Sequence, residues 1–301
     1  MLLLQVAYNI ILPILLIVCL GVIMERHFAI SPRPVSSVAF YIFIPALIIS
    51  GFAQSDLQGE EIGLILIFEV ILSFVMALLG WGVTWLFQFD RKVSSALMLT
   101  VVFINGGNYG LAVADFAFGA GGLQRGVIFF IATAITGNTL GIFLASRGTA
   151  SIWQSLRNIL LVPLPYAIMV GLIINFGHIA LPLPLDRAVT LLGQAAVPTM
   201  LVILGMQLSR TSFKGQLKPI LLATGLRLVL SPLCALPLLA MMGFTGLSWQ
   251  VMLLMSGLPT AVSTTILATE FGSDAEFISA VVLISTLGSI LTLTILLTLI
   301  L

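Results

Sequence analysis

Long apolar segments follow one another along the whole chain, and short polar stretches separate them. The longest of those polar stretches, Ser146 to Arg157, divides the chain nearly in half. The pattern predicts an all-α polytopic membrane protein with ten transmembrane helices, because each segment has close to the ~20 residues that a spanning helix needs. The ten segments are residues 3–25, 35–54, 61–87, 93–119, 123–146, 156–177, 187–208, 217–242, 248–271 and 276–300.

Composition supports this class of protein and excludes others. Hydrophobic residues make up 60% of the chain and charged residues 8%, and the mean hydropathy is +1.22. The formal net charge of +1 gives no reason to expect a nucleic-acid partner. Cys19 and Cys234 lie in apolar segments with no metal-ligand spacing, so we expect no metal and no cofactor. Paired catalytic groups are missing from the spans, and we do not expect an enzyme.

Lysine and arginine are distributed unevenly between alternate loops. Such residues are retained on the cytoplasmic side of a membrane. We therefore expect an integral protein of the cytoplasmic (inner) membrane with both termini outside the cytoplasm. The loops after the first, third, fifth and seventh segments hold nine of these residues, Arg26, Arg33, Arg91, Lys92, Arg147, Arg157, Arg210, Lys214 and Lys218, and the opposite face holds two, Arg125 and Arg187.

The fourth segment is interrupted at its centre, where Asn105–Gly110 reads NGGNYG. Each glycine costs a helix ~1 kcal/mol relative to alanine, and the asparagines bring polar groups to membrane depth. We predict a discontinuous helix, with one half ending near Ile104 and the second beginning near Tyr109. The freed backbone then has to face protein or a water-filled cavity. The alternative is a close helix crossing that needs small residues, with the asparagines bonded across it.

The two halves of the chain are related by a shift of 152 residues, which lays Pro13 on Pro165 and Gly106–Asn108 on Leu258–Thr260. The alternative is chance, because apolar sequences align easily. If each half has five spans, the second copy is inverted in the membrane, which is the inverted-repeat architecture of secondary transporters. The expected repeats are residues 1–148 and 149–301.

The ninth segment is the counterpart of the fourth. Gly257 and Pro259 interrupt it, and Ser263 follows at the start of a second half-helix. Broken helices at corresponding positions indicate a transporter's binding site, and the N-termini of two half-helices favour an anion. Asn138 is added because it lies beside a stripe of small residues in the fifth segment. The predicted substrate-binding residues are Asn105, Gly106, Gly107, Asn108, Tyr109, Asn138, Pro259, Thr260, Ser263 and Thr264.

Three ionisable residues fall inside spans, namely Glu69, Asp115 and Arg227. Charges at that depth are rare and are functional candidates by default. One interpretation is a structural ion pair between Arg227 and either Glu69 or Asp115. The other makes a carboxylate the site that couples transport to protons or sodium, and Asp115 is the better candidate because it follows Tyr109 closely.

The motifs around both breaks resemble those of the auxin efflux carrier family. The most specific are NGGNYGLAV with the following FAFG, and GLPTAVSTTILATEFG, with LRLVLSP in the eighth segment in addition. The resemblance covers the whole chain. Plant members carry a long cytoplasmic loop between the fifth and sixth spans, which is absent here, so the chain looks like a small prokaryotic member.

The resemblance implies the fold of the bile acid sodium symporters, with the fourth and ninth spans crossing at their breaks. Spans 1, 2, 6 and 7 would form a scaffold, and spans 3–5 and 8–10 a mobile core that gives alternating access. The implied substrates are small organic anions, such as indole-3-acetate or dicarboxylates. Family members often have proline in the fourth-span break, where this chain has glycine and asparagine. The sequence leaves a homodimer open.

Two other functions fit part of the pattern. A drug/metabolite exporter also has ten spans in two inverted halves, but its termini are usually cytoplasmic, opposite to the charge distribution here. An anion channel would need a continuous polar stripe along several helices, whereas the polar residues here are concentrated at two breaks. A secondary transporter of small carboxylates is therefore the leading hypothesis.

Overall fold

The computed structural model describes residues 2–53, 57–137, 163–211, 216–271 and 273–301. Every regular element in these ranges is a helix, and one isolated β-bridge joins two helix breaks. Seven helices are long and apolar enough to cross a membrane, and the shorter apolar helix Leu164–Phe176 accompanies them. An all-helical polytopic membrane protein is thereby confirmed, while the count of ten spans stays a prediction. Those seven helices are Leu2–Arg26, Pro32–Ala53, Gly59–Leu86, Gly106–Thr136, Leu183–Leu208, Leu217–Met241 and Ala275–Ile300.

The described part of the structure has seven helices long enough to span a membrane, whereas the sequence predicts ten spans, and helix breaks account for most of this difference. The expected fourth and ninth segments are each divided into short helices, and the expected boundary between the fourth and fifth segments lies inside one long helix. That helix contains Gly119 at φ +63°, a left-handed conformation that glycine adopts without strain. A change of chain direction is therefore built into it at the place where the fourth segment was expected to end.

The helices of the first half of the chain cover the first three expected segments, the divided fourth segment and part of the fifth. Asp90 caps the helix that follows it, accepting hydrogen bonds from the backbone of Lys92 at 2.8 Å and Val93 at 3.0 Å. The helices, with single π-helical turns marked η, are α1 (Leu2–Val6), η1 (Ala7–Ile11), α2 (Leu12–Arg26), α3 (Pro32–Val38), η2 (Ala39–Phe43), α4 (Ile44–Ala53), α5 (Gly59–Leu86), α6 (Arg91–Val102), η3 (Gly106–Gly110) and α7 (Leu111–Thr136).

The second half ends in a long apolar helix whose start is capped by Asp274, which accepts a 2.9 Å hydrogen bond from the backbone of Phe277. A bend at Ala195 divides the expected seventh segment in two. The helices of this half are α10 (Leu164–Phe176), α11 (Leu183–Gln194), α12 (Ala196–Leu208), α13 (Leu217–Gly225), η5 (Leu226–Leu230), α14 (Ser231–Met241), α15 (Gly246–Ser256), α16 (Ser263–Phe271) and α17 (Ala275–Ile300).

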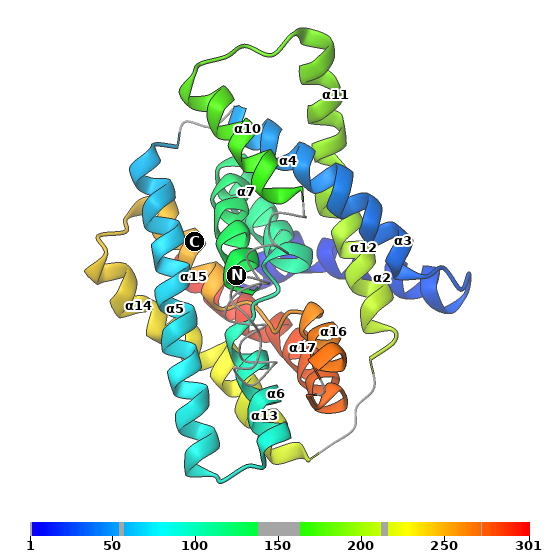
Figure 1. Ribbon diagram of the computed structural model, residues 1–301, viewed down its shortest axis with the longest axis vertical. Helices are drawn as coiled ribbons and strands as arrows, with labels where there is room; N and C mark the ends of the chain where they lie inside the picture. The colour runs from blue at the N-terminus through cyan, green and yellow to red at the C-terminus, as the bar shows by residue number, and fades with distance from the viewer. Residues whose placement is uncertain (1, 54–56, 138–162, 212–215, 272) are drawn as a thin grey trace.

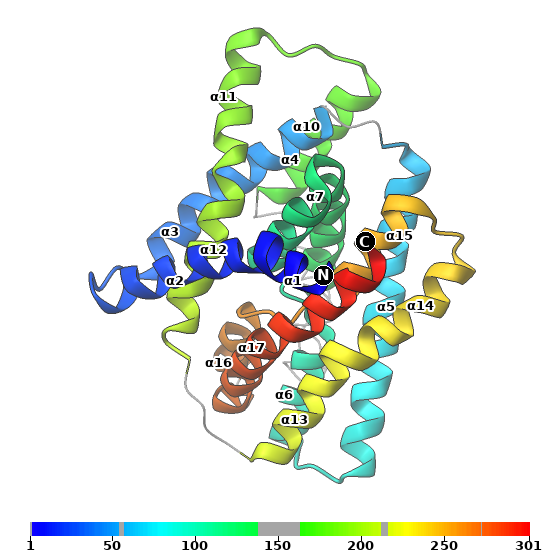
Figure 2. The same ribbon diagram turned by 180° about the vertical axis from the view of Figure 1, so that it is seen from behind.

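The helices of the expected scaffold lie beside one another, and so do those of the expected core (Figures 1 and 2). Helix α2 packs on α12, and α4 packs on α10 and α11, whereas α5 packs on α6, α7 and α14, and α15 packs on α7 and α14. In both views α5 and α12 lie on opposite sides of the molecule. The two ends of the chain lie near the centre, where α1 contacts α17.

The contact between α2 and α12 is close enough to require glycine. A Cβ atom on Gly205 would lie 1.9 Å from the carbonyl oxygen of Val18, and one on Gly21 would lie 2.1 Å from that of Val202. Small residues that let two backbones approach are typical of membrane helix crossings. These two glycines therefore fix the distance between α2 and α12.

Candidate functional site

The two broken helices pair with each other through their backbones. Helix α6 ends at Val102 and is followed by extended chain at Phe103, whereas α15 ends at Ser256 and is followed by a turn at Gly257. The backbone N–H of Asn105 donates to the carbonyl of Pro259 at 2.8 Å, and that of Ala261 donates to the carbonyl of Phe103 at 3.0 Å. These bonds make an antiparallel bridge that satisfies polar groups released by both breaks.

The predicted interruption of the fourth segment is confirmed, but its position differs from the prediction. The second half-helix begins at Gly106 and not near Tyr109, because Asn105 itself takes the turn at φ −77° and ψ 57°. The glycines lie in the first turn of that half-helix. A Cβ atom on Gly107 would come within 2.7 Å of the Phe130 ring, and one on Gly110 within 2.4 Å of Leu258. Close packing therefore accompanies the break, as the alternative interpretation required, but the asparagine side chains are not bonded across the crossing in the described residues.

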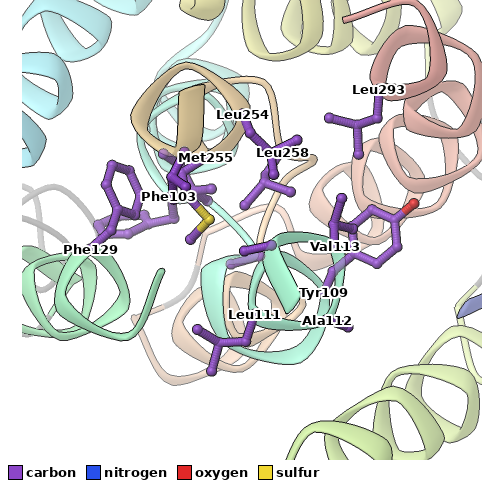
Figure 3. Close-up of a cluster of buried hydrophobic side chains, with 14 of the residues drawn as sticks. Phe103, Tyr109, Leu111, Ala112, Val113, Phe129, Leu254, Met255, Leu258 and Leu293 are labelled. Carbon is purple, nitrogen blue, oxygen red and sulfur yellow. The ribbon is translucent and has the colours of Figure 1, made fainter. Parts of the chain in front are cut away.

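Apolar side chains surround the crossing (Figure 3). Phe103 and Tyr109 from the first break lie in one buried cluster with Leu254, Met255 and Leu258 from the second. Tyr109 has only 1% of its surface exposed. Its position in this cluster makes it a packing residue in this conformation.

Asparagine side chains carry the polar chemistry of the first break. Asn105 is 4% exposed, and its side-chain nitrogen has no hydrogen-bond partner in the part of the chain that the structure describes. Asn108 is partly exposed and donates from Nδ2 to Oε1 of Gln207 on α12 at 3.1 Å. Asn138 lies outside the described residues. The first break therefore presents one unpaired amide and one amide shared with a neighbouring helix.

Hydroxyl groups carry the polar chemistry of the second break. Thr260 is fully buried, and its Oγ1 donates to the carbonyl of Thr100 at 2.8 Å, while its N–H donates to Oγ of Ser285 at 3.2 Å. Thr264 is also buried and donates to the carbonyl of Ala261 at 2.5 Å. Ser263, at the start of α16, is exposed. The threonines thus stabilise the crossing, and Ser263 is free to contact a ligand.

Arg227 forms hydrogen bonds with the C-terminal ends of α6 and α15, which are the first half-helices of the two broken spans. Its side chain is completely buried, and it donates to the carbonyl oxygens of Val101 at 2.8 Å, Ser256 at 2.5 Å and Leu258 at 3.2 Å, and to the hydroxyl of Ser231. Hydrogen bonds of this kind satisfy carbonyls that the end of a helix leaves without a partner. Arg227 therefore links the two breaks from the side of η5.

One of the two interpretations of Arg227 was an ion pair with Glu69 or Asp115, and no such pair forms among the described residues. Within the described ranges the ion pairs are Arg125 with Glu61 and Arg210 with Glu25, both at 2.8 Å. Backbone carbonyls, which the sequence does not display, accept the hydrogen bonds of the guanidinium instead.

Glu69 has hydroxyl partners of its own. The side chain is 1% exposed and accepts hydrogen bonds from Ser73 at 2.8 Å and from Thr136 at 2.7 Å. Glu69 is therefore a buried carboxylate within the helices of the expected core, and its coupling role stays a prediction.

Asp115 faces a different part of the molecule from the crossing. It lines a cavity of about 500 Å³ between α7 and the helices α2, α4, α11 and α12. None of the residues predicted at the two breaks lines this cavity. The structure therefore separates Asp115 from the breaks, although both lie along the same half-helix. The polar side chains that line the cavity are Ser50, Asp115, Gln124, Thr190 and Gln194.

Gln207 was not among the residues predicted from the sequence, and the contacts of Arg227 were not anticipated. Gln207 is an amide within an apolar segment, which is a signal that could have identified it. The contacts of Arg227 had no such signal, because they depend on which carbonyls the crossing leaves free.

Comparison with known proteins agrees with these features. A protein named "Uncharacterized transporter" from Methanothermobacter thermautotrophicus is 27% identical over 94% of this chain and 95% of its own length. Another "Uncharacterized transporter", from Methanocaldococcus jannaschii, is 26% identical over 90% of this chain and 89% of its own. A protein named "Putative malonate transporter" from Rhizobium meliloti is 32% identical over 46% of this chain and 43% of its own. The family profile described as "Membrane transport protein" matches residues 6–297, so the chain belongs to this family, that of the auxin efflux carriers.

Proposed function

We propose that the protein is a secondary active transporter that moves a small organic anion, such as a dicarboxylate or an auxin-like carboxylate, across the cytoplasmic membrane. The substrate site lies at the crossing of the two broken helices. Family membership supports transport, and the name of the Rhizobium relative supports a carboxylate substrate. The substrate enters and leaves by alternating access.

The observation that carries this proposal is the side-chain nitrogen of Asn105, which has no partner in the described part of the chain and lies beside two helix N-termini. A buried donor without a partner costs about 1–3 kcal/mol, and a carboxylate oxygen would satisfy it. The half-helices that begin at Gly106 and Ser263 direct backbone N–H groups and a partial positive charge toward the crossing. Asn108 and Ser263 add neutral donors at its edge.

The packing of the helices supports ten spans in two inverted repeats. The first expected span packs on the seventh through α2 and α12, and the second packs on the sixth through α4 and α10. If spans one and six correspond, and spans two and seven also correspond, these two contacts are copies of each other. The proposed repeats are residues 1–148 and 149–301, with α2, α4 and α10–α12 in the scaffold and α5–α7 and α13–α17 in the core.

The crossing belongs to the proposed core and meets the proposed scaffold where Asn108 bonds to Gln207 of α12, which supports alternating access by movement of the core. Asn105 and Thr260 are buried, so the crossing is closed in this conformation. Movement of the core along the scaffold would separate Asn108 from Gln207 and expose the site. Asp115 is the proposed coupling residue for protons or sodium, because it lies in the cavity between these two groups of helices.

Uptake by proteoliposomes tests this function. Purified protein should accumulate radiolabelled malonate, malate or indole-3-acetate when a proton or sodium gradient is imposed, with saturable kinetics and competition by unlabelled substrate. Protein-free liposomes provide the background. Absence of uptake for every carboxylate would contradict the proposal, and non-saturable flux driven by voltage alone would indicate an anion channel.

A further inference from the structure

Arg227 contacts the C-terminal end of the first half-helix in each broken span, α6 in one and α15 in the other. The carbonyl of Val101 lies in the last turn of α6, and that of Ser256 is the last in α15. One guanidinium bonds to both at 2.8 and 2.5 Å, and its side chain has no surface exposed. We propose that Arg227 is a positioning residue that gives the crossing its positive charge, by neutralising the negative ends of the two first half-helices.

The need for such a charge follows from the helix dipoles. A helix carries about +0.5 charge at its N-terminus and about −0.5 at its C-terminus. Four helix ends meet at the crossing: α6 and α15 end there, and η3–α7 and α16 begin there. The dipoles alone therefore sum to about zero. A guanidinium bonded to both negative ends leaves the crossing with about +1.

The surroundings of Arg227 leave this charge available. Neither of the ion pairs in the described part of the chain includes it. Glu69 forms no ion pair with Arg227 in the described ranges, and its two carboxylate oxygens accept hydrogen bonds from Ser73 and Thr136. The remaining partners are neutral: the carbonyl of Leu258, and the hydroxyl of Ser231, which also donates to the carbonyl of Ser256 at 2.8 Å.

Arg227 does not need to touch the substrate to act in this way. It bonds to carbonyls behind the breaks, while the N–H groups of the second half-helices face the proposed site. Its charge acts through the low dielectric of the buried crossing, where charges interact more strongly than in water. The site should therefore discriminate between substrates of the same shape according to their charge. This inference rests on the proposed function.

Two probes that differ by one charge test the inference. Malonate is a dianion near neutral pH, and malonamate, its monoamide, has nearly the same shape and a single charge. We would measure the Kd of both by calorimetry for the wild type, Arg227→Lys and Arg227→Gln, with thermal unfolding to establish that each purified variant is folded.

We expect Arg227→Gln to weaken malonate binding at least tenfold more than malonamate binding, which corresponds to ~1.4 kcal/mol. Arg227→Lys should keep the wild-type ratio of the two Kd values even if both rise, because it keeps the charge. A ratio that is the same in all three proteins would overturn the inference and leave Arg227 a packing role. If Arg227→Gln does not fold, the wild type provides the test, since equal affinity for the two probes contradicts a positive site.

The same experiment separates this inference from the proposed function. Wild-type protein that binds neither probe and takes up no carboxylate in proteoliposomes would contradict carboxylate transport itself. Wild-type protein that binds both, with an unchanged ratio in the folded variants, would contradict only the role of Arg227.

Discussion

The amide nitrogen of Asn108 donates a 3.1 Å hydrogen bond to the amide oxygen of Gln207. Asn108 lies in the first turn after the break in the fourth segment, and Gln207 lies near the end of α12. The bond joins the helices of the proposed core to those of the proposed scaffold. If the core moves along the scaffold, this bond breaks in every transport cycle.

A double-mutant cycle measures the strength of that bond. Asn108→Ala and Gln207→Ala should each lower the free energy of unfolding by about 0.5–1.5 kcal/mol, and the double variant should lower it by less than the sum. Chemical unfolding of purified protein in detergent gives the three values. Strictly additive effects would show that the two amides do not interact in solution.

Close helix packing predicts a large effect for a small substitution. Gly205→Ala places a methyl group 1.9 Å from a backbone oxygen of Val18, so α2 and α12 must separate. We expect a loss of about 1–3 kcal/mol or more. Gly82→Ala is the matched control, because nothing lies within 4 Å of its Cβ position and it also lies inside a helix. Equal melting temperatures for the two variants would refute the close contact.

The breaks could be predicted from the sequence because their cause is local. Glycine and proline weaken a helix wherever they stand, so NGGNYG and Gly257–Pro259 indicate interruptions without any tertiary information. Their exact position could not be predicted in the same way. Asn105 takes the turn because the backbone of Pro259 accepts its N–H, and that partner belongs to a distant segment.

Tertiary contacts also explain what the sequence did not reveal about the site. An ion pair was one interpretation of Arg227 because charged side chains are visible in a sequence, whereas the freed carbonyls of Val101 and Ser256 are not. Gly21 and Gly205 look like any other glycine until α2 crosses α12. The resemblance to the auxin efflux carriers indicated the family directly, and that is confirmed.

Neutralising the carboxylate in the cavity tests the proposed coupling. Asp115→Asn should abolish gradient-driven accumulation in proteoliposomes while sparing the exchange of labelled for unlabelled substrate. The variant should fold, because Asp115 is partly exposed and forms no ion pair with Arg227 in the described ranges. Asp186→Asn, a carboxylate at the start of α11, is the control. Normal accumulation by well-folded Asp115→Asn protein would assign coupling elsewhere.

Cysteine labelling tests the proposed orientation. With Cys19 and Cys234 replaced by alanine, single cysteines would be introduced at Phe28, which is 60% exposed between Arg26 and Arg33, and at Ala180, which is exposed between α10 and α11. A membrane-impermeant maleimide should label Ala180→Cys in intact cells, and Phe28→Cys only after permeabilisation. The reverse pattern would place the termini in the cytoplasm.

The affinity of malonate for variants of the crossing tests the central claim most directly. Losing one neutral donor costs about 0.5–1.5 kcal/mol, or up to ~3 kcal/mol when its charged partner is left unmet. At ~1.4 kcal/mol per tenfold, Asn105→Ala, Asn108→Ala and Ser263→Ala should each weaken binding between severalfold and about a hundredfold. Asn175→Ala is the matched control, because it removes an amide that donates to the carbonyl of Phe52 at 2.9 Å, within the proposed scaffold. The account predicts unchanged affinity for that control and weaker binding for the three crossing variants, whereas equal affinity for all five proteins would place the site elsewhere.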